Sequence, residues 1–273
     1  MSAADSVLRL VGAAAIGYLA LVAIMYVAQR RLLYIPDRAP PSPIAAGLPE
    51  MAEERLVAAD GVALGAWWRP PPEGRGVVVY LHGNAGNLAS LTVKLRPYLD
   101  WGLGVLAIDW RGYGKSEGSP TEDGLYADGR AALDFLAAKG IRPERVALHG
   151  ESLGSGVATQ LATERPVAAL ILEAPYTSVA DIAQHHYPYL PARWLVKDRF
   201  DSLSRIAAIR APILIIHGEA DHTIPVDHGK RLLAAAGGKA KGIFLPGANH
   251  VDLFDRGVFR DIRAFLEPLI AKA

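Results

Sequence analysis

A serine between two closely spaced glycines is the first candidate for chemistry in this chain of 273 residues. It belongs to Gly150-Glu151-Ser152-Leu153-Gly154, which follows the apolar stretch 145–149 and precedes a helical pattern. A G-x-S-x-G motif between a strand and a helix lifts its serine above the sheet on a tight turn that needs the glycines. Ser152 is therefore a candidate nucleophile for acyl transfer, and its alternative role is that of a helix N-cap.

A serine hydroxyl needs a base to take its proton, and that base needs a carboxylate to fix its tautomer. Asp221 follows the apolar run 213–216, and His250 lies in the loop after the next run, 242–245. Both lie at the carboxyl ends of predicted strands, the same sheet edge as Ser152. The chain order serine, acid, histidine is that of the α/β-hydrolase fold. We therefore predict Ser152, Asp221 and His250 as a catalytic triad.

Other acidic and histidine side chains are weaker candidates for these roles. His222 and His228 follow Asp221 too closely to be carried by the next strand loop, and Glu219 is an alternative acid. Structural or surface roles are predicted for His217, Asp252, Asp255, His185 and His186. The last two lack a third ligand at metal-site spacing, so no metal site is predicted. No G-x-G-x-x-G follows the early strand, and no cofactor is expected.

The tetrahedral intermediate of acyl transfer also needs hydrogen-bond donors for its oxyanion. The backbone N–H of Leu153, the residue after the nucleophile, is one predicted donor. The second is expected from the loop after an early strand, which reads HGNAGN at 82–87. There we predict the backbone N–H of Asn84 as the donor and a structural role for His82 beneath the loop.

These residues require a scaffold of alternating strands and helices. Apolar runs predict strands at 77–81, 104–108, 146–148, 169–172, 213–216 and 242–245, and amphipathic stretches predict helices near 88–101, 123–139, 154–163, 227–236 and 258–270. An opening pair of strands, 55–58 and 62–69, is joined by the Asp60-Gly61 turn. This alternation predicts an α/β fold with a mainly parallel sheet and helices on both faces. Residues 176–207, rich in aromatics and proline, interrupt the rhythm and predict a small cap.

The N-terminal segment is apolar rather than amphipathic. Leu10 to Ala28 has 19 residues and no charge, and a helix of that length, about 28 Å, would cross a bilayer core. We predict a transmembrane anchor at 7–29. A cleaved signal peptide would end in small residues, whereas bulky Tyr26 lies near the end of this run, and a buried core helix would show a polar face.

Two further segments are predicted after the anchor. Residues 30–49 are predicted to be a proline-rich tether and 50–273 the α/β-hydrolase domain. Three arginines follow the span, at Arg30, Arg31 and Arg38, and favour a cytoplasmic catalytic domain on a single-pass membrane protein.

Composition excludes several classes of protein. Lys plus Arg (29) nearly balance Asp plus Glu (28), and no basic face is evident, so nucleic acid is not an expected partner. The chain has no cysteine, which excludes disulfides, a thiolate nucleophile and Cys-ligated metals. The composition leaves the oligomeric state open.

The motifs together resemble those of membrane-anchored α/β-hydrolase-domain proteins, similar to the animal protein depalmitoylases and their fungal, plant and bacterial relatives. The matching stretches are HGNAGN at 82–87, DWRGYGKSEG at 109–118, GESLG at 150–154, APYTS at 174–178, GEADHTIP at 218–225 and GANH at 247–250. The resemblance implies hydrolysis through an acyl-enzyme without a cofactor, with Ser152, Asp221 and His250 as triad and Asn84 and Leu153 as oxyanion donors. Some animal members carry an N-terminal cysteine cluster that is missing here, so a depalmitoylating role is an analogy only.

The resulting prediction is a serine hydrolase that cleaves carboxylic esters or thioesters of small-molecule or lipid-derived acyl groups. Four cap aromatics either line an acyl pocket or pack the cap: Tyr176, Tyr187, Tyr189 and Trp194. Two alternatives remain, namely a peptidase of prolyl-aminopeptidase type and a catalytically silent membrane-tethered scaffold.

Overall fold

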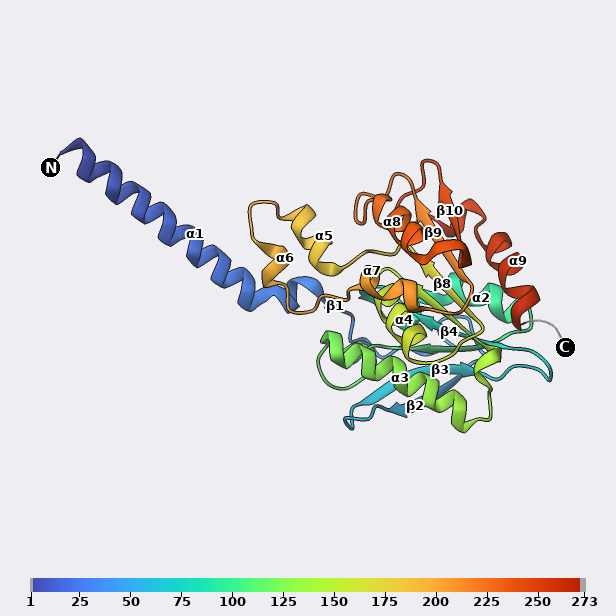
Figure 1. The fold of residues 1–273 in the computed structure, drawn as a ribbon. Coiled ribbons are helices and arrows are strands. Elements are labelled where there is room, and N and C mark those ends of the chain that lie inside the picture. Colours follow the sequence, from blue (N-terminus) through green and yellow to red (C-terminus); the bar gives the residue numbers. More distant parts are fainter. Residues whose placement is uncertain (1, 271–273) are drawn as a thin grey trace.

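A twisted sheet with helices on both faces forms the body of the protein, and one long helix projects from it (Figure 1). The computed structural model describes residues 2–270, so the end of the predicted domain at 273 lies outside the described residues. The described strands of the main sheet follow the order β10-β9-β8-β7-β4-β6-β3-β2. Their bounds are β2 Ala52–Val57, β3 Ala63–Arg69, β4 Val77–Leu81, β6 Gly104–Ile108, β7 Val146–Glu151, β8 Ala169–Glu173, β9 Ile213–Gly218 and β10 Ala240–Leu245.

Most of the sheet is parallel, which confirms the prediction from the alternation of strands and helices. Only the β2–β3 and β3–β6 pairs are antiparallel among the described pairs of this sheet. The central strand β4 is buried along its whole length, as expected for a continuous apolar run covered on both faces. Successive β4 residues point to opposite sides, so Val77 and Val79 join one core and Val78 and Tyr80 the other.

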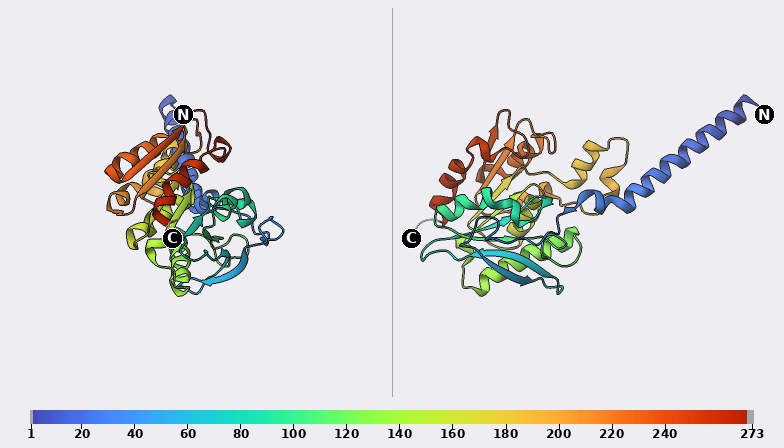
Figure 2. Two further views of the ribbon diagram at one scale, coloured as in Figure 1. Left: turned by 90° about the vertical axis from the view of Figure 1, so that its right-hand side faces the viewer. Right: turned by 180° about the vertical axis from the view of Figure 1, so that it is seen from behind.

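Two groups of helices cover the two faces. The helices α3 (Glu122–Ala138), α4 (Leu153–Glu164) and α8 (Asp227–Ala236) contribute to one core, and α2 (Thr92–Asp100) and α9 (Phe259–Ile270) contribute to the other. Each was predicted to within a few residues, although residues 88–91 form a 3-10 turn ahead of α2. The view turned by 90° shows the sheet between these layers (Figure 2, left).

The long helix α1 spans Ala3–Leu33 and begins with a capping box between Ser2 and Asp5. None of its residues is buried in the protein, and by length and composition it could cross a membrane. A helix with apolar side chains all around and no protein cover needs another apolar surrounding. Its C-terminal half lies beside the cap, whereas its N-terminal half extends away from the body (Figures 1 and 2).

The cap follows β8 and contains α5 (Val179–His186), α6 (Ala192–Leu195) and α7 (Ser202–Arg205). It is bonded to α1. The Arg30 guanidinium donates two hydrogen bonds to Asp198, at 2.8 and 2.9 Å. The Gln29 side chain accepts from the Lys197 N–H at 2.7 Å and donates to the Leu195 carbonyl.

The proline-rich segment after α1 packs on the domain. The strand β1 (Ile35–Pro36) pairs in parallel with β5 (Ala85–Gly86). Tyr34 and Leu48 are buried, because their apolar surface is better placed in the core than in water. The tether is therefore short and fixed.

Candidate active site

Ser152 lies between the end of β7 and the start of α4 with a backbone φ of 48°. A positive φ is unusual for a residue with a Cβ and is typically found where the surroundings enforce it. The glycines on either side permit this turn by close packing. A Cβ at Gly150 would lie 2.5 Å from the carbonyl oxygen of Gly154, and one at Gly154 would overlap the carbonyl oxygen of Leu81. The motif thus fixes the serine at the sheet edge.

The structure brings Ser152, His250 and Asp221 together in a line of hydrogen bonds. The distance from His250 Nε2 to Ser152 Oγ is 3.1 Å, and that from His250 Nδ1 to Asp221 Oδ2 is 2.7 Å. Asp221 lies in the loop after β9 and His250 in the loop after β10, so both reach the edge where β7 presents the serine. This geometry can move a proton from the hydroxyl to the imidazole.

The Asp221 carboxylate is buried and accepts several hydrogen bonds. The N–H groups of Thr223 and Ile224 each donate to Oδ1 at 2.8 Å, and His217 Nε2 lies 3.3 Å from Oδ2. Burial alone would raise the pKa of Asp221, but the hydrogen bonds from His217, His250 and Ile224 outweigh it and hold this pKa well below its ordinary value. Asp221 therefore stays ionised and can fix His250 with its proton on Nδ1.

The alternative acids and bases lie elsewhere. Glu219 and His222 are exposed, and His228 Nδ1 is 2.8 Å from the Thr177 hydroxyl. The remaining candidates also have other surroundings: Asp252 accepts from the Asn249 N–H, Asp255 is exposed, and His185 and His186 contact each other on the exposed side of the cap. Within residues 2–270 no three His, Asp or Glu side chains are grouped to hold a metal ion.

The two predicted oxyanion donors border the same pocket as the serine. Leu153 is the first residue of α4, so its N–H has no partner within the helix. The loop of Asn84 lies against the elbow, because a Cβ at Gly83 would be 3.6 Å from the Cβ of Ser152. Asn84, Ser152 and Leu153 line one pocket.

The Asn84 side chain anchors its loop to the end of α1. Its Oδ1 accepts from the Tyr113 hydroxyl at 2.9 Å and from the Ile35 N–H at 3.3 Å, and its Nδ2 donates to the Leu33 carbonyl. Tyr113 also donates to the Asn84 carbonyl at 2.8 Å. The loop beside the nucleophile is thus held by the segment that leaves the long helix.

His82 and Asp109 lie buried beneath this loop, where a structural role is predicted for His82. The His82 ring contacts the Gly83 carbonyl at 2.7 Å through Nδ1, and Asp109 accepts from the Leu88 N–H at 2.9 Å. Burial lowers the pKa of His82 to about 4 and raises that of Asp109 to about 7. Arg111, which follows Asp109 after β6, pairs with Asp128 and Asp60.

A partly buried polar network lies next to the elbow, and no sequence pattern predicts it. Lys94 pairs with Glu151 and lies 3.5 Å from Glu173, which in turn is 3.0 Å from His149. Tyr80 donates to Glu151 at 2.7 Å. These residues come from α2, β4, β7 and β8, and no motif links them, so only the packed sheet reveals the network.

The pocket above Ser152 has an apolar and a polar side. Its apolar lining includes Leu33, Leu153, Val179, Ile182 and Ile224, and its polar lining includes Ser90, Lys94 and Glu151. Tyr176 also lines it, whereas Tyr189 and Trp194 are exposed on the cap. Such a site suits a substrate with one apolar and one polar end.

The fold and this arrangement of side chains define an α/β hydrolase. The family model described as serine aminopeptidase S33 matches residues 72–204. An uncharacterized protein of Mycobacterium tuberculosis is 42% identical over 247 residues, with 87% of each chain covered. Protein ABHD12B of Homo sapiens is 38% identical over 207 residues, which cover 65% of this chain and 56% of that one. The chain belongs to the α/β-hydrolase family and is thus a hydrolase by class.

Solved structures support the same fold at lower sequence identity. The esterase Pf2001 of Pyrococcus furiosus superposes with a TM-score of 0.71 at 20% identity, covering 87% of this chain and 98% of that one. The esterase RhEst1 of Rhodococcus gives a TM-score of 0.62 at 19% identity, with 80% and 100% covered. At this identity the likeness concerns the fold.

Proposed function

We propose that this protein is a membrane-anchored serine hydrolase that cleaves carboxylic esters or thioesters through an acyl-enzyme on Ser152. The observation that carries the proposal is the position of His250, within hydrogen-bond distance of both Ser152 Oγ and Asp221 Oδ2. The esterase names of two structural neighbours agree with the proposed bond type.

The reaction follows from this geometry. His250 Nε2 takes the Ser152 proton as Oγ attacks the acyl carbonyl, and ionised Asp221 stabilises the imidazolium that forms. The N–H groups of Leu153 and Asn84 donate to the oxyanion. His250 then protonates the leaving alcohol or thiol, and a water activated by the same imidazole releases the acid and regenerates Ser152.

An aminopeptidase activity is the second candidate, because the matching family model carries that description. Such an enzyme needs an acidic side chain free to bind the substrate amine. The acid among the described residues lining the pocket is Glu151, and it is already paired with Lys94 and Tyr80. The pocket therefore favours an ester or thioester over a peptide with a free amino terminus.

The test compares wild type with Ser152→Ala, both shown to be folded by circular dichroism. Each is exposed to a fluorophosphonate probe and assayed on p-nitrophenyl esters from acetate to palmitate, with an aminoacyl p-nitroanilide as the peptidase substrate. We expect labelling and ester turnover by wild type alone, with a loss on the order of 10⁶ in kcat, as in the best-studied triad of this type. Labelling of both proteins, or of neither, would contradict the assignment of Ser152.

For the anchor, we propose that α1 crosses the bilayer once and that the catalytic domain is cytoplasmic. The apolar, uncovered helix and the arginines after it support this orientation. Protease protection in sealed inverted vesicles tests it. Digestion of the catalytic domain supports a cytoplasmic domain, whereas protection places it on the other side.

A further inference from the structure

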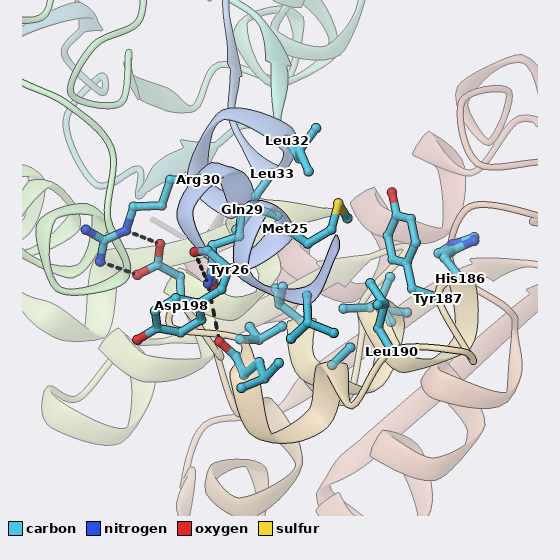
Figure 3. A pocket seen from close by; sticks show the side chains of 17 residues that line it. Met25, Tyr26, Gln29, Arg30, Leu32, Leu33, His186, Tyr187, Leu190 and Asp198 are labelled. Carbon is cyan, nitrogen blue, oxygen red and sulfur yellow. Dashed lines mark hydrogen bonds and ion pairs between the residues drawn. The ribbon is translucent and has the colours of Figure 1, made fainter. Parts of the chain in front are cut away.

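An apolar groove lies between the C-terminal half of α1 and the cap (Figure 3). The helix contributes Met25, Tyr26 and Leu33 to it, and the cap contributes Ile182, Tyr187 and Leu190. Its charged lining residues Arg30 and Asp198 are bonded to each other. The groove therefore offers an apolar surface to its occupant.

The groove adjoins the catalytic pocket. Leu33, Val179 and Ile182 line both the groove and the pocket that contains Ser152 and His250. The groove and the catalytic pocket therefore adjoin at these three side chains. The lining of the catalytic pocket also includes Lys94 and Glu151.

The far end of the groove lies along the part of α1 that we propose crosses the bilayer. Met25 and Tyr26 belong to the uncharged run 10–28. The part of α1 that lines the groove, residues 22–33, is about 17 Å long. The cap reaches further along the helix, where the Tyr18 hydroxyl donates to the Tyr189 carbonyl at 2.9 Å.

The outer surface of the cap is aromatic, with Trp194 81% and Tyr189 59% exposed. Tryptophan and tyrosine of this kind are enriched where a membrane protein meets the lipid headgroups. Trp194 and Tyr189 are therefore suited to contact a bilayer surface beside α1.

We infer that this groove binds the fatty acyl chain of a membrane-resident amphiphilic ester or thioester, with the last turns of α1 as one wall of the site. The acyl chain lies between α1 and the cap, its carbonyl carbon lies at Ser152, and its polar leaving group lies toward Lys94 and Glu151. The helix is therefore part of the substrate site as well as an anchor. The inference rests on the proposed hydrolase function and specifies its substrate class.

The first test fills the groove from the helix side in the full-length protein in detergent micelles. Met25 lines the groove, whereas its neighbour Ile24 does not and is 63% exposed. We compare Met25→Trp with the matched control Ile24→Trp on p-nitrophenyl acetate and palmitate. Each methylene bound in the groove is worth about fourfold in kcat/KM. We expect M25W to lower the ratio of kcat/KM for palmitate to kcat/KM for acetate at least tenfold, and I24W to leave this ratio unchanged.

The outcomes separate the inference from the proposed function. Normal palmitate hydrolysis by M25W would overturn the acyl groove while leaving the hydrolase intact. Equal losses in M25W and I24W would also overturn it, because a general disturbance of the helix would then explain both. Failure of wild type on every ester would instead count against the proposed function.

A second test does not depend on turnover. The chain has no cysteine, so Met25→Cys and Ile24→Cys, each combined with Ser152→Ala, carry a single thiol. Their alkylation by N-ethylmaleimide is followed with added palmitate or acetate. We expect palmitate to slow alkylation of the M25C thiol at least fivefold and to leave the I24C thiol unchanged, with no effect of acetate. Equal rates for the M25C thiol with and without palmitate would refute the groove as an acyl site.

Discussion

Replacement of Asp221 by asparagine is the most direct test of the proposed catalytic triad. The asparagine carbonyl oxygen can still accept the N–H bonds of Thr223 and Ile224, so the loop keeps its shape. Its amide N–H₂ then faces His250 Nδ1, which must become an acceptor. The imidazole proton moves to Nε2, and the ring can no longer take the proton of Ser152. We expect kcat to fall by about 10⁴, which corresponds to about 5.4 kcal/mol of lost transition-state stabilisation.

The assay is kcat and KM for a p-nitrophenyl ester with active-site titration of each preparation. Glu219→Gln is the matched control, because Glu219 is exposed two residues away and should leave kcat unchanged. A D221N enzyme that keeps more than a tenth of the wild-type kcat would refute the role of Asp221. A large loss in E219Q instead would transfer that role to Glu219.

The effect of D221N on thermal stability should also depend on pH. The folded-state pKa of Asp221 lies below its unfolded value of 3.8. The ionised carboxylate therefore contributes stability above about pH 4, and this contribution is lost as the pH falls through the folded pKa. We expect the difference in Tm between wild type and D221N to shrink as the pH is lowered below 4. A difference that is constant down to the acid transition would contradict this account.

Three further predictions follow from other contacts. Gly154→Ala should prevent the elbow from forming, because its Cβ would overlap the carbonyl of Leu81. Labelling by the fluorophosphonate probe and near-ultraviolet circular dichroism test this prediction, and normal labelling of the variant would contradict it. Tyr113→Phe removes two hydrogen bonds to Asn84 and should lower kcat about two- to tenfold by loosening the oxyanion loop, with wild-type kinetics as the refuting result. Burial lowers the pKa of His228 to about 4. The neutral ring therefore contributes stability above pH 6.5, and this contribution is lost as the pH falls toward 4. His228→Asn should flatten the decline of Tm between pH 6.5 and 4, and an unchanged slope would refute this prediction.

The sequence predicts the fold and the position of the nucleophile well for a physical reason. Parallel strands end at one sheet edge, so residues that follow different strands meet there. Ser152, Asp221 and His250 each follow a strand that its apolar run identifies. Their meeting could be predicted without knowledge of any long-range contact.

The structure adds contacts that no local pattern encodes. His217 lies on β9 and contacts the acid four residues further on only because the chain folds back after the strand. Lys94 and Glu151 pair across α2 and β7. The composition of the proline-rich segment predicts a tether but does not predict the burial of Leu48 within it. These contacts depend on which surfaces meet in the folded chain.

The junction after α1 has a consequence for how this protein can be handled. Soluble fragments of anchored enzymes are often made by deleting the N-terminal helix. A fragment that begins at residue 34 would lose the Leu33 carbonyl that accepts a hydrogen bond from Asn84. It would also lose the Arg30 guanidinium that pairs with Asp198, and the Asp198 side chain is only 4% exposed. Such a fragment would carry a loosened loop and an Asp198 carboxylate without its arginine partner. Kinetics measured on it would describe a different catalyst, so the intact chain in detergent or lipid is the form to assay.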